Sequence, residues 1–168
     1  MGERMKVVRD DGGRASYGYK GTAPGDCVCR SIAIVTGRPY VEIYARLNQG
    51  SSDERGSRGA TARSGIRTTR KWFKDLMKEL GFEWVPCMGI GTGAKVHLWG
   101  GELPMGRLVV KVSRHLTAVI DGVIHDTFDP QRDVHIMDFN GANSSDDPRV
   151  THRVARRCVY GYWKLVTT

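Results

Sequence analysis

A chain of 168 residues is long enough to bury one hydrophobic core and short for two ordinary domains. Its 40% hydrophobic and 26% charged residues are typical of a globular protein, and no apolar run approaches the ~20 residues of a membrane-spanning helix. The net charge of +8 favours acidic partners, such as nucleic acid or an acidic host protein, without identifying one.

The N-terminus indicates a reducing compartment, which decides how the four cysteines are interpreted, since they could in principle form two disulfides. Residues 1–13 lack the apolar core of a secretory signal, so we expect a cytoplasmic protein with no membrane partner. The cysteines are therefore expected to be free thiols. Their spacing matches no zinc motif, and we expect neither a metal nor another cofactor. The four are Cys27, Cys29, Cys87 and Cys158.

The first half of the chain is predicted to be helical. Residues 1–24 are polar and rich in glycine, and are expected to be a lead-in that can add an edge strand to a single domain over 25–168. Asp26 is a suitable N-cap for a helix that begins at Cys27 and ends at Gly37. Apolar periodicity predicts further helices over 39–49 and 68–80, with a polar loop at 50–65 between them.

The second half is predicted to be mostly β-structure. Alternating apolar residues predict strands at 82–85, 107–112, 116–120, 123–128 and 158–165. Asp121-Gly122 is a strong signal for a two-residue hairpin loop between the strands at 116–120 and 123–128. Helices that precede a largely antiparallel sheet give the fold class α+β.

The start of the first predicted helix is a suitable place for a reactive thiol. The helix dipole and the unpaired N–H groups there favour an anion, which lowers the pKa of the Cys27 thiol, and the same N–H groups can stabilise an oxyanion. Cys29 lies two positions further on and points to another face of the helix, so the two thiols cannot serve one site equally. The Asp26 carboxylate opposes a thiolate unless it is engaged in capping the helix.

Hairpin geometry relates a histidine to a carboxylate. With Asp121-Gly122 as the loop, Asp126 lies opposite Thr117 and diagonal to His115 on the same face. The Cβ atoms of such neighbours lie roughly 7 Å apart, within reach of an imidazole–carboxylate hydrogen bond. A cysteine nucleophile requires this pairing of base and orienting group, so the helix that carries Cys27 is expected to dock on this face. Taken singly, each residue also fits a structural role: Cys27 as a small buried thiol, His115 as a cap of its strand and Asp126 as a turn residue.

Three segments resemble papain-like cysteine hydrolases of bacteriophages and bacteria. In this chain, the segment GDCVCRSIAIVTGRPYVEIY is similar to the helix of that family that bears the nucleophile. The segment LPMGRLVVKVSRHLTAVIDGVIHDTFD is similar to the family's histidine and aspartate strands, and CVYGYW is similar to its closing strand. The resemblance runs from Gly25 to Trp163 and implies a papain-like fold, with N-terminal helices packed on a mainly antiparallel sheet.

The resemblance also implies an activity. Cys27 takes the position of the nucleophile, His115 that of the base and Asp126 that of the orienting carboxylate, as in a cysteine protease or amidase acting on a peptide or amide substrate. A phage-encoded member acts in the cytoplasm of the host cell. Papain has a glutamine before its cysteine that donates to the oxyanion, but the segment YKGTAPGDC contains no Gln or Asn. Thr22 or backbone amides are the candidates for that role.

A second class of function stays open, namely a catalytically weak or inactive papain-like fold that serves as a basic binding protein for nucleic acid or for a phage or host component. Basic residues around the start of the third predicted helix would contact phosphates, and Trp72 would stack on a base. The simpler interpretation is a solvated helix face with Trp72 in the core. The basic residues are Arg63, Arg67, Arg70, Lys71 and Lys74.

Overall fold

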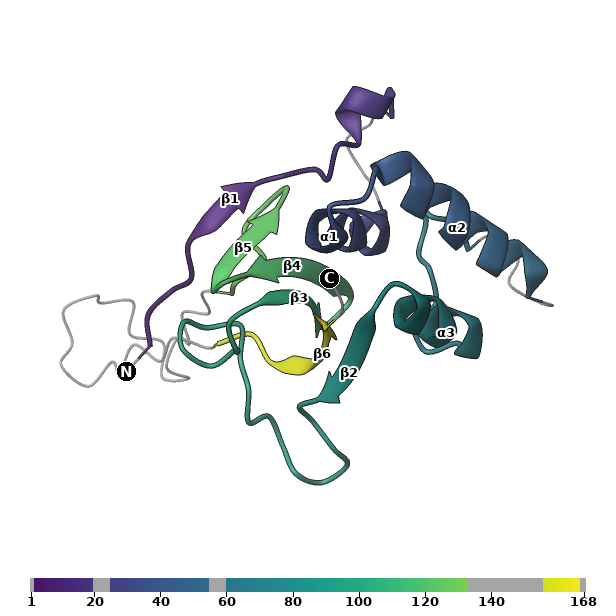
Figure 1. Cartoon of the computed structure of the whole chain (residues 1–168). Helices are drawn as coiled ribbons and strands as arrows, with labels where there is room; N and C mark the ends of the chain where they lie inside the picture. Colours follow the sequence, from purple (N-terminus) through teal and green to yellow (C-terminus); the bar gives the residue numbers. More distant parts are fainter. Residues whose placement is uncertain (1, 20–24, 55–59, 133–155, 167–168) are drawn as a thin grey trace, which may run out of the picture.

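The computed structural model describes residues 2–19, 25–54, 60–132 and 156–166 of the chain. Within these ranges three α-helices gather along one side of a curved sheet (Figure 1). The helices are α1 (Cys27–Thr36), α2 (Tyr40–Asp53) and α3 (Lys71–Glu79), and a 3-10 turn spans Ala15–Tyr17. The strands are β1 (Val7–Arg9), β2 (Phe82–Pro86), β3 (Arg107–Val112), β4 (His115–Ile120), β5 (Val123–Asp126) and β6 (Val159–Leu165).

In this part of the chain the six strands form one mixed sheet in the order β1-β5-β4-β3-β6-β2. β1 runs parallel to β5, and every other neighbouring pair is antiparallel. The predicted α+β class is therefore confirmed. The polar lead-in supplies β1, which makes one edge of the sheet.

The local sequence explains where the helices end. α1 stops at Gly37, whose φ of 70° is the left-handed conformation that glycine adopts without strain. α2 continues to Asp53, beyond its predicted end, and passes through Gly50. A Cβ atom at Gly50 would lie only 2.3 Å from Trp72 Cε3, so the absence of a side chain lets the Trp72 indole of α3 pack closely against α2.

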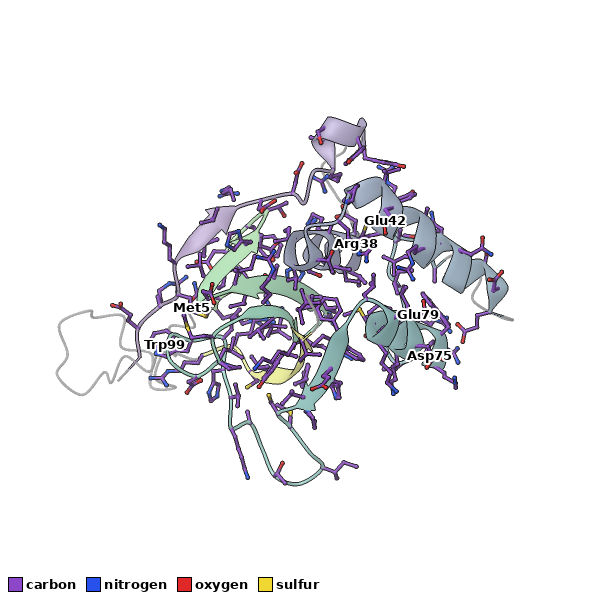
Figure 2. The ribbon with its side chains drawn as sticks, viewed as in Figure 1. Met5, Arg38, Glu42, Asp75, Glu79 and Trp99 are labelled. Atoms are coloured by element: carbon purple, nitrogen blue, oxygen red, sulfur yellow. The ribbon has the colours of Figure 1, made fainter. Side chains whose placement is uncertain are left out.

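Two hydrophobic cores cover the two faces of the sheet, because successive strand residues point to opposite faces. One core joins the helices to the face that bears Val109, Ala118 and Trp163. The other core lies on the opposite face, where Met5 packs with strand residues such as Val119. Figure 2 labels Met5 on the side of the molecule away from α2 and α3.

Contacts at its two ends hold α1 against β3 and against α2. The Arg107 guanidinium of β3 donates to the carbonyl oxygens of Ile34 and Val35, at 2.8 and 2.5 Å, and so satisfies carbonyl groups that the end of the helix leaves unpaired. At the other end the Tyr40 hydroxyl donates to Asp26 Oδ2 at 2.8 Å. None of the helices in the described ranges is long and apolar enough to cross a membrane.

Candidate active site

The hairpin of β4 and β5 has the predicted register. Its loop residues Asp121 and Gly122 have φ values of 48° and 79°, as a two-residue hairpin turn requires. The ladder pairs Ile120 with Val123, Val119 with Ile124 and Ala118 with His125. His115 Nε2 lies 2.6 Å from Asp126 Oδ2, so the predicted contact between the diagonal pair is confirmed.

The predicted docking face for α1 is wrong. α1 packs in the same core as Leu116 and Ala118, whereas the face expected from the alternation is that of Val119, which belongs to the other core. The ladder between β4 and β5 stops one pair short of Thr117 and Asp126. Both residues nevertheless remain in strand ladders, Thr117 opposite Val110 of β3 and Asp126 opposite Arg9 of β1, and the Arg30 guanidinium of α1 lies 3.3 Å from Asp126 Oδ1.

The Cys27 thiol interacts with the His115 ring and with the backbone of Leu116. Burial alone raises the pKa of this thiol, but hydrogen bonding with His115 and with the Leu116 N–H, together with the positive charges of His115 and Arg30, brings the pKa below its ordinary value. Conversely, burial lowers the pKa of His115, but hydrogen bonding with Asp126 and with the thiol raises it to about 9. Both shifts favour a thiolate beside an imidazolium.

The Asp126 carboxylate is held in place by four donors. Oδ2 accepts from His115 Nε2 at 2.6 Å and from the Thr117 hydroxyl at 2.7 Å. Oδ1 accepts from the Thr127 N–H at 2.7 Å and from the Arg30 guanidinium at 3.3 Å. Burial raises the pKa of Asp126, but the hydrogen bonds to His115 and Thr117 and the nearby positive charges lower it overall, so the carboxylate stays ionised. An ionised, fixed carboxylate orients the ring and stabilises its protonated form.

Asp26 occupies the predicted N-cap position of α1, but its side chain does not cap the helix. Its side chain makes no capping bond and instead accepts from Arg30 at 2.6 Å and from the Tyr40 hydroxyl. The Arg14 guanidinium lies 3.3 Å away as well. The Asp26 and Arg30 side chains are only 1% and 4% exposed, so they form a buried ion pair that offsets the negative charge next to Cys27.

Arg30 is the site residue that sequence reasoning missed. It bridges the two buried carboxylates Asp26 and Asp126, which are far apart in sequence. The i,i+4 spacing of Asp26 and Arg30 on one helix indicates their pairing. Nothing local in the sequence indicates the contact with Asp126, since that contact depends on how α1 packs against β5.

Cys29 and the oxyanion candidate Thr22 remain to be placed. Cys29 is fully buried, and burial raises the pKa of its thiol to about 12, so only Cys27 of the two is suited to reaction. Thr22 lies outside the described residues. Because Asp26 leaves the first turn of α1 without a side-chain cap, backbone N–H groups are available beside Cys27. Within the described ranges no group of three or more metal-ligating side chains converges.

Part of the basic series, together with Trp72, is engaged with neighbouring side chains. The Trp72 indole is partly buried against the helical core and donates to Glu54 at 3.1 Å. Arg70 also pairs with Glu54, at 3.3 Å, and Lys71 pairs with Asp75 at 2.6 Å. The simpler interpretation of Trp72 as a packing residue therefore agrees with its contacts. Arg63, Arg67 and Lys74 remain solvent-exposed.

No relative was found. Comparisons with models of protein families, with curated proteins and with solved structures gave no match for this chain. The membership of the papain-like superfamily therefore stays a prediction from the sequence, and the candidate site rests on its own geometry.

Proposed function

We propose that this chain is a cysteine-dependent acyl-transfer hydrolase, a peptidase or amidase of papain-like type. One observation carries the proposal, namely that the His115 ring lies between the buried Asp126 carboxylate, at 2.6 Å, and the Cys27 thiol at the start of a helix. A nucleophile, a base and an orienting group in this order are what covalent acyl transfer requires.

The first half of the reaction forms a thioester. Since Nε2 of His115 is engaged with Asp126, Nδ1 is the ring nitrogen left to exchange a proton with the thiol. The Cys27 thiolate attacks the carbonyl carbon of the substrate and forms a C–S bond. His115 then donates its proton to the leaving amine nitrogen as the C–N bond breaks, so the amine departs neutral and the acyl group stays on sulfur.

The second half releases the acid. His115, now neutral, accepts a proton from water as the water oxygen attacks the thioester carbonyl. The C–S bond breaks, the thiolate is restored beside the imidazolium, and a carboxylic acid leaves. In both halves the charge that develops on the carbonyl oxygen needs donors, and the uncapped N–H groups of the first turn of α1 are the candidates within the described residues.

Site-resolved alkylation of the thiols tests the proposal. The protein is treated with iodoacetamide at pH 7, and the rate at each cysteine is read by peptide mass spectrometry. We expect Cys27 to react about 30-fold faster than a free model-peptide thiol, which is only a few per cent ionised at this pH, and faster than Cys158 of the same chain. His115→Ala should remove this advantage, because the thiolate loses its counter-ion.

His97→Ala is a matched control. The Nδ1 atom of this histidine lies 3.0 Å from Glu102 Oε2, and the residue does not line the small space that contains Cys27, so the rate at Cys27 should be unchanged. Turnover is measured on a mixed-sequence library of peptides and peptide amides, with Cys27→Ala as the blank. Equal alkylation rates at Cys27 and Cys158 would refute the activated thiol. A reactive thiol with no hydrolysis of any library member would favour the alternative of an inactive binding fold.

A further inference from the structure

A cavity of about 340 Å³ opens on the helix side of the sheet, between α3 and the strands β2, β3, β4 and β6. Its size is at the lower end of the range for small-ligand sites. Lysines and tryptophans dominate its lining: Lys74, Lys78 and Lys111, with Trp84 and Trp163. None of these residues belongs to the Cys27 site described above.

The three lysines reach the cavity from different elements. Lys74 and Lys78 are one turn apart on α3 and so share a face of that helix, while Lys111 lies on β3. Among the described residues no carboxylate lies within ion-pair distance of any of the three, whereas Lys71 on the same helix is paired with Asp75 at 2.6 Å. Unpaired cations that converge on one cavity favour an anionic ligand.

The tryptophans form an apolar floor below these charges. Trp84 and Trp163 pair across β2 and β6, and their ring centroids lie 5.1 Å apart. The Trp84 ring lies close over Gly161, where a Cβ atom would be 2.4 Å from Trp84 Cζ2. Trp84 is still 39% exposed, although it is a large apolar side chain. A half-exposed indole that is held in place by a glycine offers a surface for the aliphatic part of a ligand.

Leu116 connects this cavity to the candidate active site. It lines the cavity and also lines the small space that contains Cys27 and Asp126. Its cross-strand partner is Lys111, and it follows His115 directly in β4. A chain bound with its carbonyl at Cys27 can therefore place a neighbouring side chain in the cavity.

We propose that the cavity lined by Lys74, Lys78 and Lys111 is a subsite for an acidic side chain of a peptide substrate, which rests on the proposed function of Cys27. A glutamate side chain supplies both of the features that the lining selects, since its methylenes pack on the indoles and its carboxylate meets the ammonium groups. Nucleic acid is the less suitable ligand, because a phosphodiester backbone has no acyl carbon for Cys27 to attack, and because the lysines converge on one cavity rather than follow a strand.

Peptide binding to Cys27→Ala tests the subsite without relying on turnover. Two blocked peptides are compared, one with glutamate alternating with serine and one with glutamine in place of each glutamate. Binding is followed by the change in tryptophan fluorescence at low ionic strength. We expect the glutamate peptide to bind about tenfold more tightly, and the difference to shrink as salt is added. The double variant Lys74→Glu/Lys78→Glu should abolish or reverse this preference.

The double variant Lys71→Glu/Lys95→Glu is the matched control. It changes the net charge by the same amount at exposed lysines that do not line the cavity, so the preference for glutamate should persist. Equal binding of the two peptides, or equal loss of preference in both double variants, would overturn the subsite. The subsite would also be overturned if a single-stranded oligonucleotide bound more tightly than the glutamate peptide and lost its binding only in Lys74→Glu/Lys78→Glu.

The alkylation experiment tests the hydrolase and the binding experiment tests the subsite, so either proposal can be refuted without the other. If the wild-type Cys27 shows no enhanced alkylation but Cys27→Ala still prefers glutamate, the hydrolase is refuted and the anionic subsite is supported. If Cys27 is activated but the peptides bind equally, the hydrolase is supported and the acidic substrate class is refuted.

Discussion

Replacing Asp126 by asparagine tests whether the carboxylate keeps the His115 ring protonated. The pKa of His115 is raised from 6.5 to about 9, and this shift corresponds to about 3 kcal/mol of interaction with the protonated ring. Because burial acts in the opposite direction, Asp126 and Cys27 together supply the whole of the increase. Without the charge of Asp126 we expect the pKa of His115 to fall by about 1–3 units.

The same substitution should also destabilise the fold. Both oxygens of Asp126 accept hydrogen bonds, and they do so from four groups: the His115 ring, the Thr117 hydroxyl, the Thr127 N–H and the Arg30 guanidinium. An amide has one oxygen and one NH₂ group, so the NH₂ faces either the Thr127 N–H and Arg30, which are both donors, or the protonated His115 ring, and only loss of the Nε2 proton of His115 relieves the second clash. Each such unsatisfied group costs about 1–3 kcal/mol of unfolding free energy.

The assay is an NMR titration of isotope-labelled histidine combined with urea unfolding. The His115 signal is assigned by its absence from His115→Gln. Asp129→Asn is the control, since this carboxylate is 39% exposed and pairs with Arg4 at the surface, where an ion pair contributes at most about 1 kcal/mol. A folded Asp126→Asn in which the pKa of His115 is unchanged would refute the assignment of Asp126 as the orienting carboxylate.

Two further predictions concern the pH profile and Arg30. Peptide hydrolysis should fall as pH rises through the His115 pKa of about 9, because the ring then has no proton for the leaving amine. Alkylation of Cys27 should persist at this high pH, since the thiolate remains. Both hydrolysis and alkylation should fall in acid, as the pH drops through the lowered pKa of Cys27. Arg30→Met should lower the unfolding free energy by about 3–5 kcal/mol in urea at pH 7, because two buried carboxylates lose their shared cation, and should slow alkylation at Cys27. Arg38→Met, which removes an exposed pair with Glu42 (Figure 2), should cost less than about 1 kcal/mol; a similar loss in both variants would contradict the role given to the buried bridge.

The sequence by itself determined the features that depend on neighbouring residues. The turn residues Asp121-Gly122 fix the register of one hairpin, and the alternation of side chains then brings His115 and Asp126 together. The start of α1 at Cys27 and its end at Gly37 follow from local preferences in the same way. These interactions join residues within one helix or one hairpin, so periodicity and turn chemistry are sufficient to predict them.

Only the tertiary structure decided how these parts meet. The expected docking face was wrong because α1 packs in the core that contains Leu116 and Ala118, and Asp26, although it occupies the predicted N-cap position, directs its carboxylate to Arg30 and Tyr40 and not to the helix end. Likewise, the subsite gathers lysines from α3 and β3, which no single periodic pattern connects. Burial makes an unpaired charge costly, so Arg30 settles where packing places two carboxylates. That placement is a property of the packed chain and not of any one segment.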